Sequence, residues 1–196
     1  MRRAGPSGCL IELPGGEHVA DLARFLREQA LPGVTDIVPG ARTVLLDGAA
    51  PADLRSRLAV WQPGEGSGDE ERRVEIPVVY DGPDLADVAG LIGLTPDQVV
   101  EKHTGADARV AFCGFAAGFA YITGLPAELH VPRLGRPRTA VEAGSVGLAA
   151  EFTGIYPRRS PGGWRLIGRT AVELWDERRD PPALLAPGTR VRFLCA

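Results

Sequence analysis

With 196 residues, the chain is long enough for one large domain or two small ones, each with a hydrophobic core. Hydrophobic residues make up 44% of it and charged residues 24%, as in an ordinary soluble globular protein. The formal net charge of -3 gives no reason to expect nucleic acid or an anionic membrane surface as a partner.

No apolar stretch approaches the length of about eighteen residues that a membrane-spanning helix needs, and no apolar signal segment follows the basic start of the chain. The three cysteines, Cys9, Cys113 and Cys195, are odd in number and irregularly spaced, which disfavours a disulfide framework and a metal site. We therefore expect a cytoplasmic protein with reduced thiols, no bound metal and no membrane contact.

In the first part of the chain, apolar residues recur at spacings that alternate between strand and helix. The spacing predicts strands at 9–13, 34–38 and 43–46 and helices at 17–29 and 51–60. This β-α-β-β-α order favours a small ferredoxin-like α/β domain over residues 1–61, with a generic α/β module as the alternative. Residues 62–73 are rich in Gly, Pro and charge and contain no apolar residue, which indicates a linker between two domains.

Residues 74–196 predict a second domain of a different kind. It begins with a strand at 74–80 and helices at 84–92 and 95–102, the latter with Thr95 as N-cap and Pro96 in the first turn. Short apolar runs then alternate with Gly- and Pro-rich turns, at 109–113, 145–150, 164–168, 171–174 and 190–194. This texture favours a β-barrel or sandwich, so the whole chain is predicted to be α+β.

Gly114 to Tyr121 is the densest motif of the second domain. Gly114 and Gly118 allow the backbone to approach a ligand closely, and Phe115, Phe119 and Tyr121 can supply an apolar wall with one hydroxyl. The alternative is a tight barrel corner whose aromatic rings fill the core. Because no Gly-Lys-Ser/Thr follows, the motif is not a P-loop.

Two further motifs follow. Gly144 and Ser145 precede a predicted strand, where the serine is either a donor to an anionic substrate or a turn residue. Residues 154–170 begin with a Tyr-Pro turn at Tyr156, followed by a sharp loop at Gly162 and Gly163, after which Trp164 caps a pocket or a core. Near their end, Arg169 is suited to a carboxylate or phosphate.

His103 and the arginines complete the candidates. His103 lies near the end of a predicted helix, where histidines serve either as packing and capping residues or as acid–base groups. Arg133 and Arg138 belong to a basic stretch, which indicates either an anion site or a solvated surface.

Several stretches occur together and in order: IPVVYDGPDLADVA from Ile76, GFAAGFAYI from Gly114, AGSVG from Ala143, TGIYPRRSPGGWRLIGRT from Thr153 and LLAPGTRVRF from Leu184. With them, the chain resembles the carboxyltransferase C/D family, which includes the B-type subunits of 5-oxoprolinase, allophanate hydrolase subunit 1 and KipI-like proteins. The resemblance is strong from Ile76 onward and weaker before it.

The resemblance implies a cyclophilin-like β-barrel after the small domain, and a subunit that is catalytic only in a complex. The complex is expected to be an ATP-dependent 5-oxoprolinase, which opens 5-oxoproline to glutamate, or a related enzyme acting on another lactam or amide. Its partners would be a LamB/YcsF-type protein as the A-type member and a homologous C-type member, the counterpart of allophanate hydrolase subunit 2. ATP with Mg is expected to bind in the complex.

In such an enzyme, the catalytic candidates are His103, Tyr121 and Arg169. Cationic groups and backbone donors near a developing charge would bind substrate or ATP. The candidates for binding are Gly114, Phe115, Gly118, Phe119, Arg133, Arg138, Gly144, Ser145, Tyr156, Gly162, Gly163 and Trp164.

The chain departs from the family pattern where Ala116-Ala117 replaces Gln-Pro and where Phe152 replaces a glutamine. Two alternatives therefore stay open: a KipI-like inhibitor of a sensor histidine kinase, and a divergent paralogue that binds a carboxylate metabolite.

Overall fold

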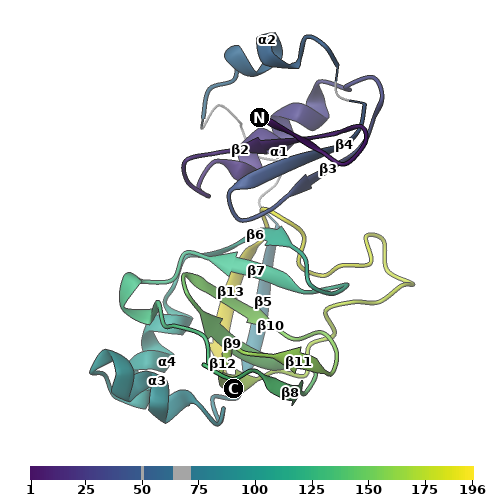
Figure 1. Ribbon diagram of the computed structural model, residues 1–196. Helices are drawn as coiled ribbons and strands as arrows, with labels where there is room; N and C mark the ends of the chain where they lie inside the picture. Colours follow the sequence, from purple (N-terminus) through teal and green to yellow (C-terminus); the bar gives the residue numbers. More distant parts are fainter. Residues whose placement is uncertain (50, 64–71) are drawn as a thin grey trace. The chain divides into compact units, whose positions relative to one another are not determined.

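The computed structural model describes residues 1–49, 51–63 and 72–196, which fall into two compact units, Met1–Glu70 and Glu71–Ala196 (Figure 1). Most of the linker predicted at 62–73, namely residues 64–71, lies outside the described residues. The linker and the domain boundary therefore stay predictions. In the described part of the chain, no helix is long and apolar enough to cross a membrane.

The N-terminal unit is an antiparallel four-stranded sheet with helices against it (Figure 1). Its elements are β1 (Arg2–Ala4), β2 (Gly8–Glu12), α1 (Val19–Glu28), β3 (Val34–Pro39), β4 (Thr43–Gly48) and α2 (Leu54–Ala59). The sheet order β1-β2-β4-β3 places β4 between β2 and β3, the split β-α-β arrangement of a ferredoxin-like fold. The strand beside β2 is β1, which the sequence pattern did not predict.

Helix α1 forms because its apolar residues recur on one face. Val19, Leu22, Ala23 and Leu26 are all buried and pack against β3 and β4, where Val44 and Leu46 complete the core.

The C-terminal unit is built on a seven-stranded sheet that curls into a barrel (Figure 1). In order across the sheet, the strands are β12 (Arg165–Arg169), β9 (Ser145–Ala149), β10 (Phe152–Ile155), β7 (Ala120–Thr123), β6 (Ala108–Cys113), β13 (Arg190–Cys195) and β5 (Arg73–Val78). Val79 and Arg169 exchange two backbone hydrogen bonds of 2.9 Å, joining the two ends of the sheet. The α+β prediction with a cyclophilin-like barrel is confirmed.

Helices α3 (Leu85–Ile92) and α4 (Pro96–Thr104) lie side by side against the barrel (Figure 1). Helix α4 begins as predicted: the Thr95 hydroxyl accepts a hydrogen bond from the Gln98 backbone, and the Gln98 side chain accepts one from the Thr95 backbone. A short 3₁₀ turn, η1 (Ala127–Leu129), and a two-stranded ribbon of β8 (Arg138–Val141) and β11 (Ser160–Gly162) complete the unit.

One predicted strand, at 171–174, is wrong. Leu174 is buried, but this segment is not part of a ladder, and the neighbouring Trp175 forms only an isolated bridge with Ala183. The segment is apolar because side chains such as that of Leu174 pack into the core and attach a connecting segment to it. Strands β7, β8, β10 and β11, of three or four residues each, were not predicted as strands.

Two hydrophobic clusters lie on the two sides of the sheet at β9. Val146 and Leu148 belong to the main core, which the barrel strands and helices α3 and α4 share. Ala149 belongs to a second cluster with Phe119, Tyr156 and Trp164. All five residues of β9 are therefore buried.

Candidate functional site

The rings of Phe115, Phe119, Tyr121, Tyr156 and Trp164 contact one another and form a continuous surface, the aromatic wall. Phe119, which is 1% exposed, lies at its centre. Its ring centroid is 5.1 to 5.4 Å from those of Tyr121, Phe115, Trp164 and Tyr156, each in an edge-to-face arrangement. Edge-to-face pairs of this kind fix ring orientations beyond what burial alone does. The structure thus brings together the five aromatic residues that the sequence motifs singled out.

The wall continues across neighbouring strands. Tyr121 of β7 stacks on Phe112 of β6, with centroids 4.3 Å apart, and Phe152 of β10 meets both rings edge-on. These three rings are only half-buried. Sequence reasoning missed Phe112. It could have been found from its position in the predicted strand directly before the glycine-rich motif.

The glycine-rich turn holds Phe115 outward. Backbone hydrogen bonds join Gly114 to Phe119 at 3.2 Å and Phe119 to Ala116 at 3.0 Å. Gly118 has φ +81°, and a Cβ there would lie 2.9 Å from the Trp175 side chain, so only glycine fits. Phe115 itself has φ +68°, a strained conformation for a residue with a side chain, and is 60% exposed.

Tyr156 lies beneath the turn formed by Gly162 and Gly163. The side chain of Tyr156 is 1% exposed, and a Cβ on Gly162 would overlap its hydroxyl. Burial raises the pKa of Tyr156, against the opposing effects of a hydrogen bond from the Trp164 backbone to the phenol and of the charge on Arg133. The phenol is therefore neutral at physiological pH. The Gly163 carbonyl accepts a hydrogen bond from the Leu134 backbone at 2.8 Å.

Two of the three candidate arginines are occupied by carboxylates. Arg138 donates to Asp84 at 2.7 Å, and Arg169 donates to both oxygens of Asp81, the shorter Nε contact being 2.9 Å. Arg169 lies at the barrel seam, the place where its bridge with Val79 joins the two ends of the sheet. This position is away from the aromatic wall, and the Arg169 side chain is exposed.

Arg133 differs from the other two. Its guanidinium carbon lies 6.0 Å from the centroid of the Trp164 ring, at the outer limit of a cation–π contact. It is also close enough to Tyr156 to act on that phenol electrostatically. Arg133 is exposed and has no carboxylate partner within the described residues. Of the three candidate arginines, it is the one whose charge is available to a ligand.

Gly144 and Ser145 support the site through their backbones. Gly144 has φ +80° and donates to the Tyr156 carbonyl at 2.7 Å, and the Tyr156 backbone donates to the Ser145 carbonyl at 2.9 Å. The Ser145 residue is 9% exposed. These contacts fix the segment that carries Tyr156.

His103 does not reach the aromatic wall. It is fully buried in the main core, its ring centroid 4.2 Å from that of Phe193. Nδ1 lies 2.7 Å from the Tyr80 hydroxyl and Nε2 lies 2.9 Å from the Thr153 hydroxyl, two partners that sequence reasoning missed. Burial lowers the pKa of His103 to about 3, so the imidazole is neutral.

The residues around the wall do not fit an ATP–Mg site. A triphosphate needs several cationic or backbone donors, but Arg138 is already paired with Asp84, and Arg169 lies away from the wall and is paired with Asp81. Among the described residues, no group of three or more His, Cys, Asp or Glu could hold a metal ion. Phe119, Tyr156 and Trp164 are at most 4% exposed and fill a core, so the accessible part of the wall is the exposed Phe115 and the half-buried Phe112, Tyr121 and Phe152.

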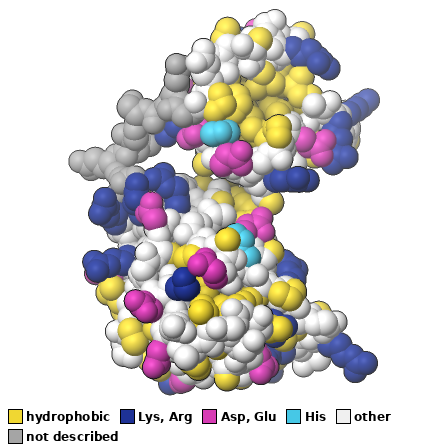
Figure 2. All heavy atoms as spheres, turned by 90° about the vertical axis from the view of Figure 1, so that its left-hand side faces the viewer, with side chains coloured by type: hydrophobic (Ala, Val, Ile, Leu, Met, Phe, Trp, Pro, Cys, Tyr) yellow, Lys and Arg dark blue, Asp and Glu magenta, His cyan; other side chains and the backbone are white. Residues whose placement is uncertain are grey.

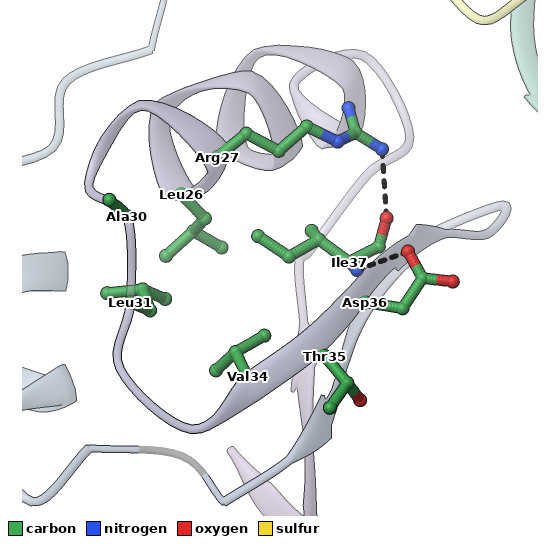
Figure 3. Close-up of a pocket in the computed structure, with 8 residues that line it drawn as sticks. All are labelled: Leu26, Arg27, Ala30, Leu31, Val34, Thr35, Asp36 and Ile37. Carbon is green, nitrogen blue, oxygen red and sulfur yellow. Dashed lines mark hydrogen bonds between the residues drawn. The ribbon is translucent and has the colours of Figure 1, made fainter.

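The N-terminal unit has a pocket of about 350 Å³ between the end of α1 and strand β3, which lies at the edge of the sheet (Figure 3). There Arg27 donates to the Ile37 carbonyl at 2.8 Å, and the Ile37 amide donates to Asp36 at 2.7 Å. Side chains thus satisfy the outward backbone groups of an edge strand, which protects it from pairing with another chain. Figure 2 also shows hydrophobic side chains gathered on one face of this unit.

Residues 1–185 match the carboxyltransferase domain, subdomain C and D. The 5-oxoprolinase B subunit of Escherichia coli O157:H7 is 45% identical over 172 residues, which are 84% of this chain and 79% of that protein. The crystal structure of a conserved protein, PH0987 from Pyrococcus horikoshii, superimposes with a TM-score of 0.62 at 32% identity, over 100% of this chain and 96% of that one. The crystal structure of TTHA0988 gives a TM-score of 0.79 at 36% identity; it covers 96% of this chain, which spans only 40% of that longer chain.

Proposed function

Because this chain belongs to the carboxyltransferase-domain family of subdomains C and D, we propose that it is the B-type subunit of a multi-subunit 5-oxoprolinase. The identity with proteins named as the B subunit of 5-oxoprolinase, over most of both chains, supports this assignment. The enzyme would open the lactam of 5-oxoproline to glutamate. The partners would be a LamB/YcsF-type protein, as the A-type member, and a homologous C-type subunit.

The observation that carries the proposal is the position of Arg133 beside the aromatic wall. 5-Oxoproline is a small ring with a single carboxylate. Arg133, which has no carboxylate partner among the described residues, would bind that carboxylate, while the ring would lie against the half-buried Tyr121, whose ring centroid is 5.6 Å from that of the buried Trp164. The contact with the indole lies at the outer limit of a cation–π interaction, so the exposed guanidinium would be ordered mainly by the carboxylate that it binds.

The chemistry also explains why this protein would not act alone. A lactam carbonyl is a weak electrophile, and its activation by phosphorylation requires ATP. Because the described residues here do not fit a triphosphate, we assign ATP to a partner and give this chain the task of holding and orienting the lactam. His103 is excluded from acid–base contact with a ligand at the wall by its burial. Tyr121, half-buried at the wall, is the candidate hydroxyl.

Co-expression with the C-type homologue from the same genome tests the proposal. A tag on one chain should retain the other, and the purified pair, supplemented with the A-type protein, should release ADP only when 5-oxoproline is present. Co-purification without 5-oxoproline-dependent ADP release would mean that another amide or lactam is the substrate. Failure of the two chains to associate would overturn the proposal and would direct the test toward a sensor histidine kinase.

A further inference from the structure

A line of hydrogen bonds runs from the half-buried Tyr80 into the core of the barrel. Tyr80 meets His103 Nδ1 at 2.7 Å, His103 Nε2 meets the Thr153 hydroxyl at 2.9 Å, and that hydroxyl donates to the Gly147 carbonyl at 3.2 Å. The Thr153 hydroxyl has one hydrogen, and it goes to Gly147, so the hydroxyl must accept from His103. Nε2 therefore carries the imidazole proton, and Nδ1 accepts from Tyr80.

The far end of this line lies directly under the aromatic wall. Thr153 is followed by Gly154 on β10, and Gly154 pairs with Gly147 on β9. A Cβ on Gly154 would lie 3.0 Å from a ring atom of Trp164, and a Cβ on Gly147 would lie 3.1 Å from the Trp164 Cβ. Trp164 thus rests on a pair of glycines with no side chains between, so its position follows the β9–β10 backbone.

Arg133 stands over that same indole. A shift of a few tenths of an ångström in the glycine pair would pass to Trp164 and then to the guanidinium. Two of the three hydrogen bonds converge on Thr153, so this residue couples the core to the wall.

We propose that Tyr80, His103 and Thr153 form a brace that fixes the Gly147–Gly154 pair and, through it, the placement of Trp164 and Arg133. His103 is then a positioning residue, because strand β10 stands between its ring and any ligand at the wall. The proposal rests on the proposed function only in naming the ligand, a lactam that carries a carboxylate.

The brace is tested first without any partner. Thr153→Val removes the hydroxyl at nearly constant volume, and Thr153→Ser keeps it. In ¹H–¹⁵N spectra, Thr153→Val and Tyr80→Phe should shift or broaden the Trp164 indole resonance, which Trp164→Phe identifies, while the Trp61 indole stays unchanged. Thr153→Ser should restore the wild-type position. An unchanged Trp164 resonance in folded Thr153→Val protein would overturn the brace.

The assembled enzyme provides the second readout. Thr153→Val should raise KM for 5-oxoproline by about fivefold and leave kcat within about twofold, because misplacement of Arg133 weakens binding rather than chemistry. Thr153→Ser should behave like the wild type. A loss of kcat with unchanged KM in both Thr153→Val and His103→Gln would contradict a positioning role. If the wild-type complex does not turn over 5-oxoproline, the proposed function fails, yet the indole resonance still decides whether the brace exists.

Discussion

Asp84 and Arg138, 54 residues apart in the sequence, form an ion pair of 2.7 Å in which the carboxylate is almost completely buried, with 6% of the aspartate side chain exposed against 29% of the arginine. The second carboxylate oxygen accepts the Leu166 amide at 2.6 Å. Asp84 therefore fastens the start of α3 to β12 and the ribbon strand β8 at a single point.

Asp84→Ala should destabilise the C-terminal unit by about 2–4 kcal/mol, because it leaves the Arg138 charge and the Leu166 amide without their partner. Glu142→Ala is the matched control. It breaks the pair with Arg159, whose side chains are 68% and 73% exposed, and should change stability by less than about 1 kcal/mol. Urea unfolding in a Trp61→Phe background, followed by tryptophan fluorescence, measures both. Equal losses in the two variants would contradict a special role for Asp84.

The arginines provide the second prediction. Arg133→Ala should lower kcat/KM for 5-oxoproline in the assembled complex by about tenfold to a hundredfold, mainly through KM, since a charge-assisted hydrogen bond to a carboxylate is worth about 1.5–3 kcal/mol. Arg169→Ala should leave KM near its wild-type value, because Arg169 is paired with Asp81 at the barrel seam. If Arg169→Ala raised KM and Arg133→Ala did not, the site would have to be moved to the seam.

The third prediction concerns pH. The pKa of His103 is about 3 in the folded protein and about 6.5 when the chain is unfolded, so between these values the unfolded chain binds the extra proton. Stability is therefore complete above pH 6.5 and is lost as the pH falls toward 3, by about 1.4 kcal/mol per pH unit. Between pH 6.5 and 5, the loss from His103 alone is about 2 kcal/mol.

His103→Gln removes that titration and should unfold with a flatter pH dependence. The quantity to measure is the difference in unfolding free energy between the two proteins from pH 7 to 5, because His18, His130 and the carboxylates are common to both. If this difference in unfolding free energy were the same from pH 7 to 5, His103 would not have a lowered pKa in the folded protein.

The sequence predicted much of the fold because its signals are local. The capping box of α4 lies within four residues, from Thr95 to Gln98, and the apolar face of α1 is visible in ten. Strand β10 has four residues, one of them Gly154, and becomes a strand only through its neighbours β7 and β9. A short segment of this kind carries little periodicity of its own.

The sequence motifs single out five aromatic residues that meet in the structure, but they do not reveal the contacts of the arginines and of His103. The five aromatic residues meet because they flank tight glycine turns, a local signal. Which arginine is available depends instead on Asp81 and Asp84, which are 88 and 54 residues from their partners along the chain. His103 likewise is neutral because it is buried among strands, and the pairing of those strands cannot be predicted from the sequence pattern.

The last prediction separates two neighbouring rings. Phe115 is 60% exposed with φ +68°, whereas Phe119 is 1% exposed at the centre of the wall. Phe115→Gly relieves the left-handed backbone but loses edge-to-face contacts with Phe119 and Tyr156, so its unfolding free energy should change by no more than about 1 kcal/mol. Phe119→Ala should lose about 3–5 kcal/mol.

A rigidly held, exposed aromatic ring is typical of an anchor at a protein interface, where a single residue often contributes more than about 2 kcal/mol of binding free energy. In a titration of the C-type partner, Phe115→Gly should therefore weaken association by at least about tenfold although the protein stays folded. Unchanged affinity would remove Phe115 from the interface. A loss of stability comparable to that of Phe119→Ala would show instead that the ring supports the wall, and that its strained backbone serves the fold rather than a partner.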